Sequence, residues 1–175
     1  MAYIFCVANQ KGGVGKTTTA VNTATALARR RQKVLLVDLD AQGNATMGSG
    51  VEKNECEKTV YQLLIGEAVF DDVVCKSPSG GYDLIPANRD LSAAEIDLMQ
   101  LKNPDRRLKN VIDKVADRYD FILIDCPPSL SMITVNALCC AHGVIIPMQC
   151  EYFALEGLSD LVNTVRRIRQ NKNAD

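Results

Sequence analysis

The sequence has almost no excess charge and no long apolar run, and each of these absences excludes a class of protein. The formal net charge is −1 over 175 residues, so any contact with nucleic acid would need a local basic patch. No uninterrupted apolar segment approaches the ~20 residues that a membrane-spanning helix needs. No charged segment precedes the first apolar run, so we expect no signal peptide and a cytoplasmic protein.

The usual ligands of zinc and iron–sulfur centres are also scarce. His142 is the single histidine, and none of the seven cysteines forms a C-x-x-C pair with another. The number of cysteines is odd and several lie in apolar runs, which favours buried reduced thiols over a disulfide framework. We expect no such metal centre within one chain, and a cluster shared across a dimer stays open.

One glycine-rich segment carries most of the information in the chain. Residues 11–18 read KGGVGKTT, with an apolar run before them and a helix-forming run after them. This order predicts a phosphate-binding loop, because backbone amides converge on an anion at the positive end of a helix. Lys16 would add a full positive charge and the Thr17 hydroxyl would bind Mg²⁺. Lys11 is a second lysine, which an ordinary phosphate-binding loop does not require.

Strands and helices alternate along the chain, which predicts a single α/β domain over residues 1–175. The predicted strands are Tyr3–Ala8, Lys33–Asp38, Tyr82–Ile85, Phe121–Asp125 and Gly143–Met148. The predicted helices are Thr17–Arg30, Thr59–Ile65, a short piece near Phe70–Cys75, one that starts at a capping box of Ser92 and Glu95, Pro104–Arg118, Ser131–Ala141 and Ala154–Gln170. Residues 39–51 are expected to be a loop, and the last helix is expected to pack on the sheet.

Three aspartates at the ends of predicted strands are candidates for metal binding and catalysis. Asp125 ends the run FILID, at the edge where open α/β sheets bind ligands, and its carboxylate would hold Mg²⁺ directly or through water. Asp38 ends the run KVLLVD and would lie nearer Mg²⁺ and Thr17, whereas Asp40 would swing toward the γ-phosphate. From spacing alone, a role as a loop cap is an equally good interpretation of Asp38 or Asp40.

Four segments, in this order, resemble the ParA/Soj-type partition ATPases. They are KGGVGKTT with Lys11 at its start, VLLVDLDAQGN at 34–44, ILIDCPPSL at 122–130 and IIPMQCEYFALEGL at 145–158. These ATPases form part of the deviant Walker A class, with the MinD-like cell-division ATPases and the nitrogenase iron protein. The resemblance covers the whole chain and implies a three-layer P-loop NTPase fold, with a mostly parallel sheet and helices on both faces.

The resemblance also implies ligands and residue roles. Lys16 would bind the β- and γ-phosphates of ATP, Lys11 would reach the ATP of a partner chain, and Asp40 would be needed for hydrolysis. The metal ligands for Mg²⁺ would be Thr17, Asp38 and Asp125. The nucleotide-binding residues would be Lys11, Gly12, Gly13, Val14, Gly15, Lys16, Thr17, Thr18 and Glu151. No guanine-reading N-K-x-D segment is present, so ATP rather than GTP is implied by the resemblance.

The implied mechanism is a switch. ATP binding would close a homodimer that binds DNA without sequence preference, and slow hydrolysis, stimulated by a ParB-type centromere-binding protein, would release this nucleoid-associated protein. Family members are longer, so we expect the C-terminal part of the family fold to be missing. Two alternatives remain: a MinD-like membrane-positioning ATPase, which would need a C-terminal amphipathic helix, and a metabolic or iron–sulfur enzyme on the same scaffold. We expect no membrane association.

Overall fold

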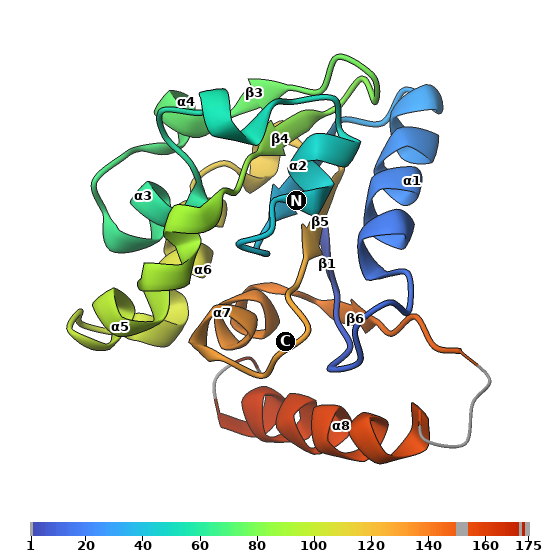
Figure 1. The fold of residues 1–175 in the computed structure, drawn as a ribbon, viewed down its shortest axis with the longest axis vertical. Coiled ribbons are helices and arrows are strands. Elements are labelled where there is room, and N and C mark those ends of the chain that lie inside the picture. The colour runs from blue at the N-terminus through green and yellow to red at the C-terminus, as the bar shows by residue number, and fades with distance from the viewer. Residues whose placement is uncertain (1, 150–153, 172, 174–175) are drawn as a thin grey trace.

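The structure is a computed structural model that describes residues 2–149, 154–171 and 173, and a six-stranded sheet forms its centre (Figure 1). The strands are β1 (Tyr3–Val7), β2 (Val34–Asp38), β3 (Cys75–Lys76), β4 (Asp83–Ile85), β5 (Phe121–Asp125) and β6 (Gly143–Ile145). Their order in the sheet is β3-β4-β2-β5-β1-β6, and every pair is parallel except β3 with β4. The predicted α/β fold with a mostly parallel sheet is confirmed.

Helices cover both faces of the sheet (Figure 1). One face is covered by α1 (Lys16–Arg29) and the short α2 (Asn44–Gly48). The remaining helices pack on the other face of the sheet or on one another. They are α3 (Val60–Ile65), α4 (Phe70–Val73), α5 (Ala94–Met99), α6 (Arg107–Ile112), α7 (Met132–Cys140) and α8 (Ala154–Asn171).

The central strands read as continuous apolar runs because both of their faces are buried. All five residues of β2 are buried. Val34 and Leu36 join the apolar cluster under α1, whereas the alternate residues of β2 join the cluster under the opposite helices. Ala20 and Ala24 of α1 are fully buried, and their small side chains let that helix lie close to the sheet.

The register of the central strands places the carboxyl ends of β1, β2 and β5 side by side. Asp125 at the end of β5 is paired with Val7 of β1 on one side and with Asp38 of β2 on the other. Two predicted metal-binding aspartates therefore stand on neighbouring strands, next to the strand that leads into the glycine-rich loop. This edge of the sheet is where open α/β folds bind their ligands.

The prediction of an uninterrupted loop over residues 39–51 is wrong, because Asn44–Gly48 forms α2. Five residues are too few to show a helical period. This helix is held by contacts with α1 and by bonds to the Asp38 carboxylate rather than by its own sequence. The two-residue strand β3 was also not predicted, and it pairs antiparallel with β4 across the turn at 77–81.

Two predicted helix boundaries are also wrong. The helical segment predicted to start at a capping box of Ser92 and Glu95 begins earlier, as a 3₁₀ turn over Arg89–Ala93 in which the Asp90 N–H donates to the Asn88 side chain. The predicted helix Pro104–Arg118 is divided into a 3₁₀ turn, α6 and a second 3₁₀ turn. Asn136 of α7 accounts for one division, because its side chain accepts the Leu108 N–H and donates to the Pro104 carbonyl.

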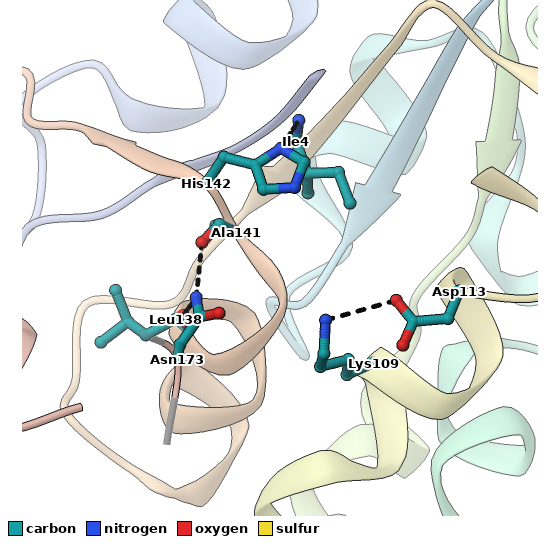
Figure 2. A network of polar contacts seen from close by, with 7 residues as sticks. All are labelled: Ile4, Lys109, Asp113, Leu138, Ala141, His142 and Asn173. Carbon is teal, nitrogen blue, oxygen red and sulfur yellow. Dashed lines mark hydrogen bonds and ion pairs between the residues drawn. The ribbon is translucent and has the colours of Figure 1, made fainter. Parts of the chain in front are cut away.

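The last helix packs against α7 rather than directly over the strands. Leu161 and Ile168 of α8 are buried in the core cluster, and a hollow of about 500 Å³ lies between α8, α7 and the edge strand β6. Beyond α8, the Asn173 side chain donates to the carbonyls of Leu138 and Ala141 at the end of α7 (Figure 2). None of the helices in the described part of the chain has the length and hydropathy needed to cross a membrane.

Candidate functional site

The glycine-rich loop runs from the end of β1 to the start of α1 and is open above its glycines. Gly13 and Gly15 have φ angles of 73° and 88°, which other residues rarely adopt. Apart from the chain neighbours, a Cβ atom at Gly12, Gly13 or Gly15 would meet no atom of the described residues within 4 Å. No side chain of the described residues caps α1, which begins after Gly15. Its first backbone N–H groups therefore remain available to an anion.

Lys16 lies inside this loop. Its side chain is 7% exposed, and Nζ donates a hydrogen bond of 3.0 Å to the Lys11 carbonyl. Burial lowers the pKa of Lys16, while the negative charges of Asp125 and Asp40 oppose that shift. A phosphate group entering the loop would give this ammonium a stronger acceptor than a neutral carbonyl.

Asn9 fixes the start of the loop. Its Oδ1 accepts the Lys11 N–H at 3.0 Å, and its Nδ2 donates to the Pro147 carbonyl at 2.9 Å, in the segment that follows β6. Lys11 is thus held through its backbone at the rim of the loop. Asn9 was not predicted as a site residue, although an asparagine two residues before a glycine-rich loop is a signal for a side chain that caps backbone groups.

Thr17 and Asp125 form a pair beside the loop that fits a divalent cation. The Thr17 hydroxyl donates to Asp125 Oδ2 at 2.7 Å, whereas Asp125 Oδ1 is buried and has no hydrogen-bond partner among the described residues. Burial raises the pKa of Asp125 to about 7, and the nearby charges of Asp38 and Asp40 act in the same direction. An unpartnered carboxylate oxygen next to a hydroxyl suits Mg²⁺, which prefers oxygen ligands and would repay the burial of the charge.

Asp38 lies next to Asp125, and both of its carboxylate oxygens already accept hydrogen bonds. Its Oδ1 accepts the Asp40 N–H at 3.0 Å, and its Oδ2 accepts both the N–H and the hydroxyl of Thr46 at 2.8 Å. Burial raises the pKa of Asp38 to about 6, although these three hydrogen bonds oppose the shift. In this arrangement Asp38 anchors the loop that follows β2, and its role as a metal ligand stays a prediction.

Asp40 stands at the outer end of the same loop. Its Oδ1 accepts the Gln42 N–H at 2.9 Å and its carbonyl accepts the Gly43 N–H at 2.8 Å. These bonds are those of a loop cap. Its charge nevertheless contributes to the pKa shifts of both Lys16 and Asp125, so the carboxylate lies within electrostatic reach of the phosphate loop.

Most of the predicted site residues meet at this edge of the sheet. Val14 is buried and Thr18 is exposed at the start of α1. Glu151 lies outside the described residues. The described cysteines form no disulfide, and within the described ranges no three His, Cys, Asp or Glu side chains gather as a metal cluster. Thr46, like Asn9, was missed, because nothing in its neighbourhood in the sequence indicates a bond to Asp38.

A parallel sheet with this glycine loop, Lys16, Thr17 and Asp125 at its carboxyl edge defines a P-loop nucleoside triphosphatase. A family model described as an AAA domain matches residues 2–175. The "Sporulation initiation inhibitor protein Soj" of Bacillus subtilis is 49% identical over 175 residues, which are 69% of its length. The chain therefore belongs to the P-loop AAA-domain family that includes Soj and the ParA proteins.

Other relatives agree with this assignment. An uncharacterized protein of Pseudomonas putida is 58% identical over the whole chain, and the "Chromosome partitioning protein ParA" of Caulobacter vibrioides is 46% identical over 172 residues. The matched regions are 66% and 64% of those proteins. The chain thus spans about two thirds of the length of the curated relatives it matches.

Solved structures agree with the fold class and with the predicted ligands. The cobyrinic acid a,c-diamide synthase of Mycobacterium smegmatis, solved with an ATP analogue and magnesium, superposes with a TM-score of 0.96 and 38% identity. The superposition includes the whole of this chain and 71% of the synthase. A plasmid partition protein of Borrelia burgdorferi superposes with a TM-score of 0.87 and 32% identity, over 97% of this chain and 75% of that one.

Proposed function

We propose that this chain is the nucleotide-binding part of an ATPase switch that binds Mg²⁺-ATP, closes as a homodimer and hydrolyses ATP slowly. The observation that carries the proposal is the unpartnered, buried Oδ1 of Asp125 beside Thr17 and the open glycine loop. The Mycobacterium smegmatis neighbour, solved with an ATP analogue and magnesium, supports ATP and Mg²⁺ as the ligands.

Phosphate binding would rearrange one hydrogen bond of the site and keep another. Lys16 would release the Lys11 carbonyl and donate to the β- and γ-phosphates. Thr17 and Asp125 would hold Mg²⁺ through the hydroxyl oxygen and a carboxylate oxygen, because the hydroxyl can donate to Asp125 Oδ2 and still offer a lone pair to the cation. Mg²⁺ bound there would neutralise phosphate charge. Asp125 must be ionised for this task, so binding should strengthen as the pH rises toward 7 and above.

Asp40 and Lys11 would supply the steps that need a second chain or a water molecule. Asp40 would orient the attacking water, since positioning is most of the catalysis in phosphoryl transfer. Lys11 lies at the rim of the loop, from which its side chain would reach the ATP of a partner chain. Glu151 would contact the same nucleotide.

We further propose a role in partitioning DNA. The names of the Bacillus subtilis and Caulobacter vibrioides relatives and of the Borrelia burgdorferi structure support it. The ATP-bound homodimer would bind DNA without sequence preference and associate with the nucleoid. A ParB-type centromere-binding protein would stimulate hydrolysis. This chain covers about two thirds of the length of these relatives. DNA and the ParB-type protein are therefore proposed as partners of the whole protein.

ATP turnover of Lys16→Ala tests the ATPase proposal. Removing the ammonium from the phosphate loop should lower turnover at least ~100-fold. Lys109→Ala is the matched control, because Lys109 of α6 pairs with Asp113, the residue that follows this helix (Figure 2). Equal turnover in Lys16→Ala and the wild type would contradict the proposal.

The oligomeric state of Asp40→Ala tests the role of Asp40. This variant should keep ATP bound and accumulate as a dimer in light scattering, and a monomer with bound ATP would contradict the role of Asp40.

A metabolic enzyme on the same scaffold is the second candidate, favoured by the likeness to the cobyrinic acid a,c-diamide synthase. The identity to Soj is higher, at 49% against 38%, and supports the partition role. ATP turnover measured with duplex DNA and with cobyrinic acid separates the two. Stimulation by cobyrinic acid alone would overturn the partition role, and ATP-dependent sedimentation with liposomes would favour the membrane-positioning relatives instead.

A further inference from the structure

Thr46 joins three separate segments of the chain through one buried hydroxyl. The side chain is fully buried in α2, and its hydroxyl donates to Asp38 Oδ2 at 2.8 Å. The same oxygen of Thr46 accepts the Ala87 N–H at 3.0 Å, from the segment that follows β4. The hydroxyl thus uses its donor and one of its acceptor positions away from water. We refer to Asp38, Thr46 and Ala87 together as the clasp.

The clasp closes the loop that carries Asp40. This loop leaves β2 at Asp38 and returns to the same carboxylate at Thr46, eight residues later. The other oxygen of that carboxylate holds the Asp40 N–H at 3.0 Å. Asp40 is therefore bonded through its backbone to a group whose position depends on Thr46.

Packing leaves the loop little freedom to shift around the clasp. A Cβ atom at Gly43 would lie 2.7 Å from the Ala87 carbonyl oxygen, so the loop touches the Ala87 backbone at Gly43 as well as at Thr46. Ala45, the neighbour of Thr46, is fully buried in the cluster under α1. A densely packed interior shifts when a buried group is lost, so removal of the Thr46 hydroxyl should change the position of Asp40.

We propose that Thr46 is a positioning residue for hydrolysis, which acts through Asp38 to set where Asp40 stands beside the phosphate loop. This inference rests on the proposed function, because the role of Asp40 in hydrolysis belongs to that proposal. Lys16 and Thr17 have their own partners, Lys11 and Asp125, and neither bonds to Thr46. Loss of the hydroxyl should therefore lower the rate of hydrolysis and leave the affinity for nucleotide nearly unchanged.

Thr46→Val and Thr46→Ser test the inference by steady-state ATP turnover and by titration with a fluorescent ATP analogue. Thr46→Val keeps the shape and removes the hydroxyl, so kcat should fall on the order of tenfold to a hundredfold with a Kd within about threefold. Thr46→Ser keeps the hydroxyl and should retain kcat within about threefold. Thr25→Val, which removes a hydroxyl bonded within α1, is the matched control and should behave as the wild type.

Equal kcat for Thr46→Val and the wild type would overturn the inference, and so would an equal loss in Thr46→Val and Thr46→Ser. Should Thr46→Val not fold, Thr46→Cys replaces the hydroxyl by a weak hydrogen-bonding group of similar size, and the same loss of kcat is expected.

Hydrogen exchange separates this inference from the proposed function. The amides of Asp40, Thr46 and Ala87 should exchange slowly in the wild type and Thr46→Ser, and on the order of tenfold faster in Thr46→Val. A wild type without ATPase activity would refute the proposed function and the positioning role together. Unchanged exchange at these amides in an active Thr46→Val would refute the clasp alone.

Discussion

The loop after β1 and the loop after β2 leave the same edge of the sheet, and glycine serves a different purpose in each. At Gly12, Gly13 and Gly15 an added Cβ would meet no described residue beyond its chain neighbours within 4 Å, so the first loop keeps an open surface. At Gly43 an added Cβ would lie 2.7 Å from a backbone oxygen, so the second loop is filled by its own chain. The first loop is built to receive a ligand, whereas the second is built to hold a side chain in place.

The aspartates beside these loops differ in the same way. Asp125 and Asp38 are paired in register on neighbouring strands, and burial raises the pKa of both. Asp38 accepts three hydrogen bonds, while Asp125 keeps one oxygen that no group in the described part of the chain bonds. A full set of hydrogen bonds indicates a structural anchor, and an unpartnered buried oxygen indicates a position for a ligand.

Asp38→Ala should break the filled loop most severely. It leaves the N–H groups of Asp40 and Thr46 and the Thr46 hydroxyl without their acceptor, so the free energy of unfolding should fall by about 4 kcal/mol. Denaturant unfolding at pH 6, near the raised pKa of Asp38, measures the change, because ionisation of this buried carboxyl lowers stability at higher pH. A loss below about 1 kcal/mol would show that water replaces the carboxylate at little cost and that this loop is not anchored by Asp38.

Gly43→Ala should have the next largest effect. Gly43 has a φ of 62° and its added Cβ would overlap the Ala87 carbonyl, so we expect a loss of about 2–3 kcal/mol. Gly12→Ala is the matched control in the open loop, and it should change stability by less than about 0.5 kcal/mol while weakening nucleotide binding. Similar losses of stability in the two variants would remove the distinction between the loops.

Asp125→Asn should stabilise the nucleotide-free chain. The pKa of Asp125 is raised from its ordinary value of 3.8 to about 7, so the folded chain binds more protons than the unfolded chain between these values. This carboxyl therefore lowers stability as the pH rises through that window. The gain of Asp125→Asn should reach about 2 kcal/mol at pH 8 and be smaller at pH 5. A variant that is less stable than the wild type at pH 8 would show that Asp125 is an anchor like Asp38.

The residues that face the phosphate loop are predictable from the sequence because they obey local rules. Lys16 and Thr17 follow a fixed spacing of glycines, and Asp125 follows an apolar strand. The bond from Asn9 to the Pro147 carbonyl and the bond from the Ala87 N–H to Thr46 follow no such rule, since they join residues 138 and 41 positions apart. Such residues are visible only when the fold brings their partners together.

The same reasoning explains which elements of the fold were predicted. The strands β2 and β5 are buried on both faces, as is the carboxyl end of β1, and burial leaves continuous apolar runs in the sequence. The helix α2 leaves no comparable pattern, because it is five residues long and is fixed by Asp38 and α1. The break between Pro104 and α6 depends on Asn136, which lies 32 residues after Pro104 and 28 residues after Leu108 in the chain.

The order of the strands also determines when during folding the site comes into being. Thr17 and its partner Asp125 are 108 residues apart, and the parallel pairing of β1 with β5 joins segments of similarly long separation, such as Tyr3 with Phe121. Contacts of such long range form slowly. A partly folded chain without β5 has the glycine loop but no carboxylate beside it. Nucleotide should therefore bind only the chain in which the sheet is complete. Because partly folded chains do not bind it, nucleotide should slow unfolding much more than it speeds folding.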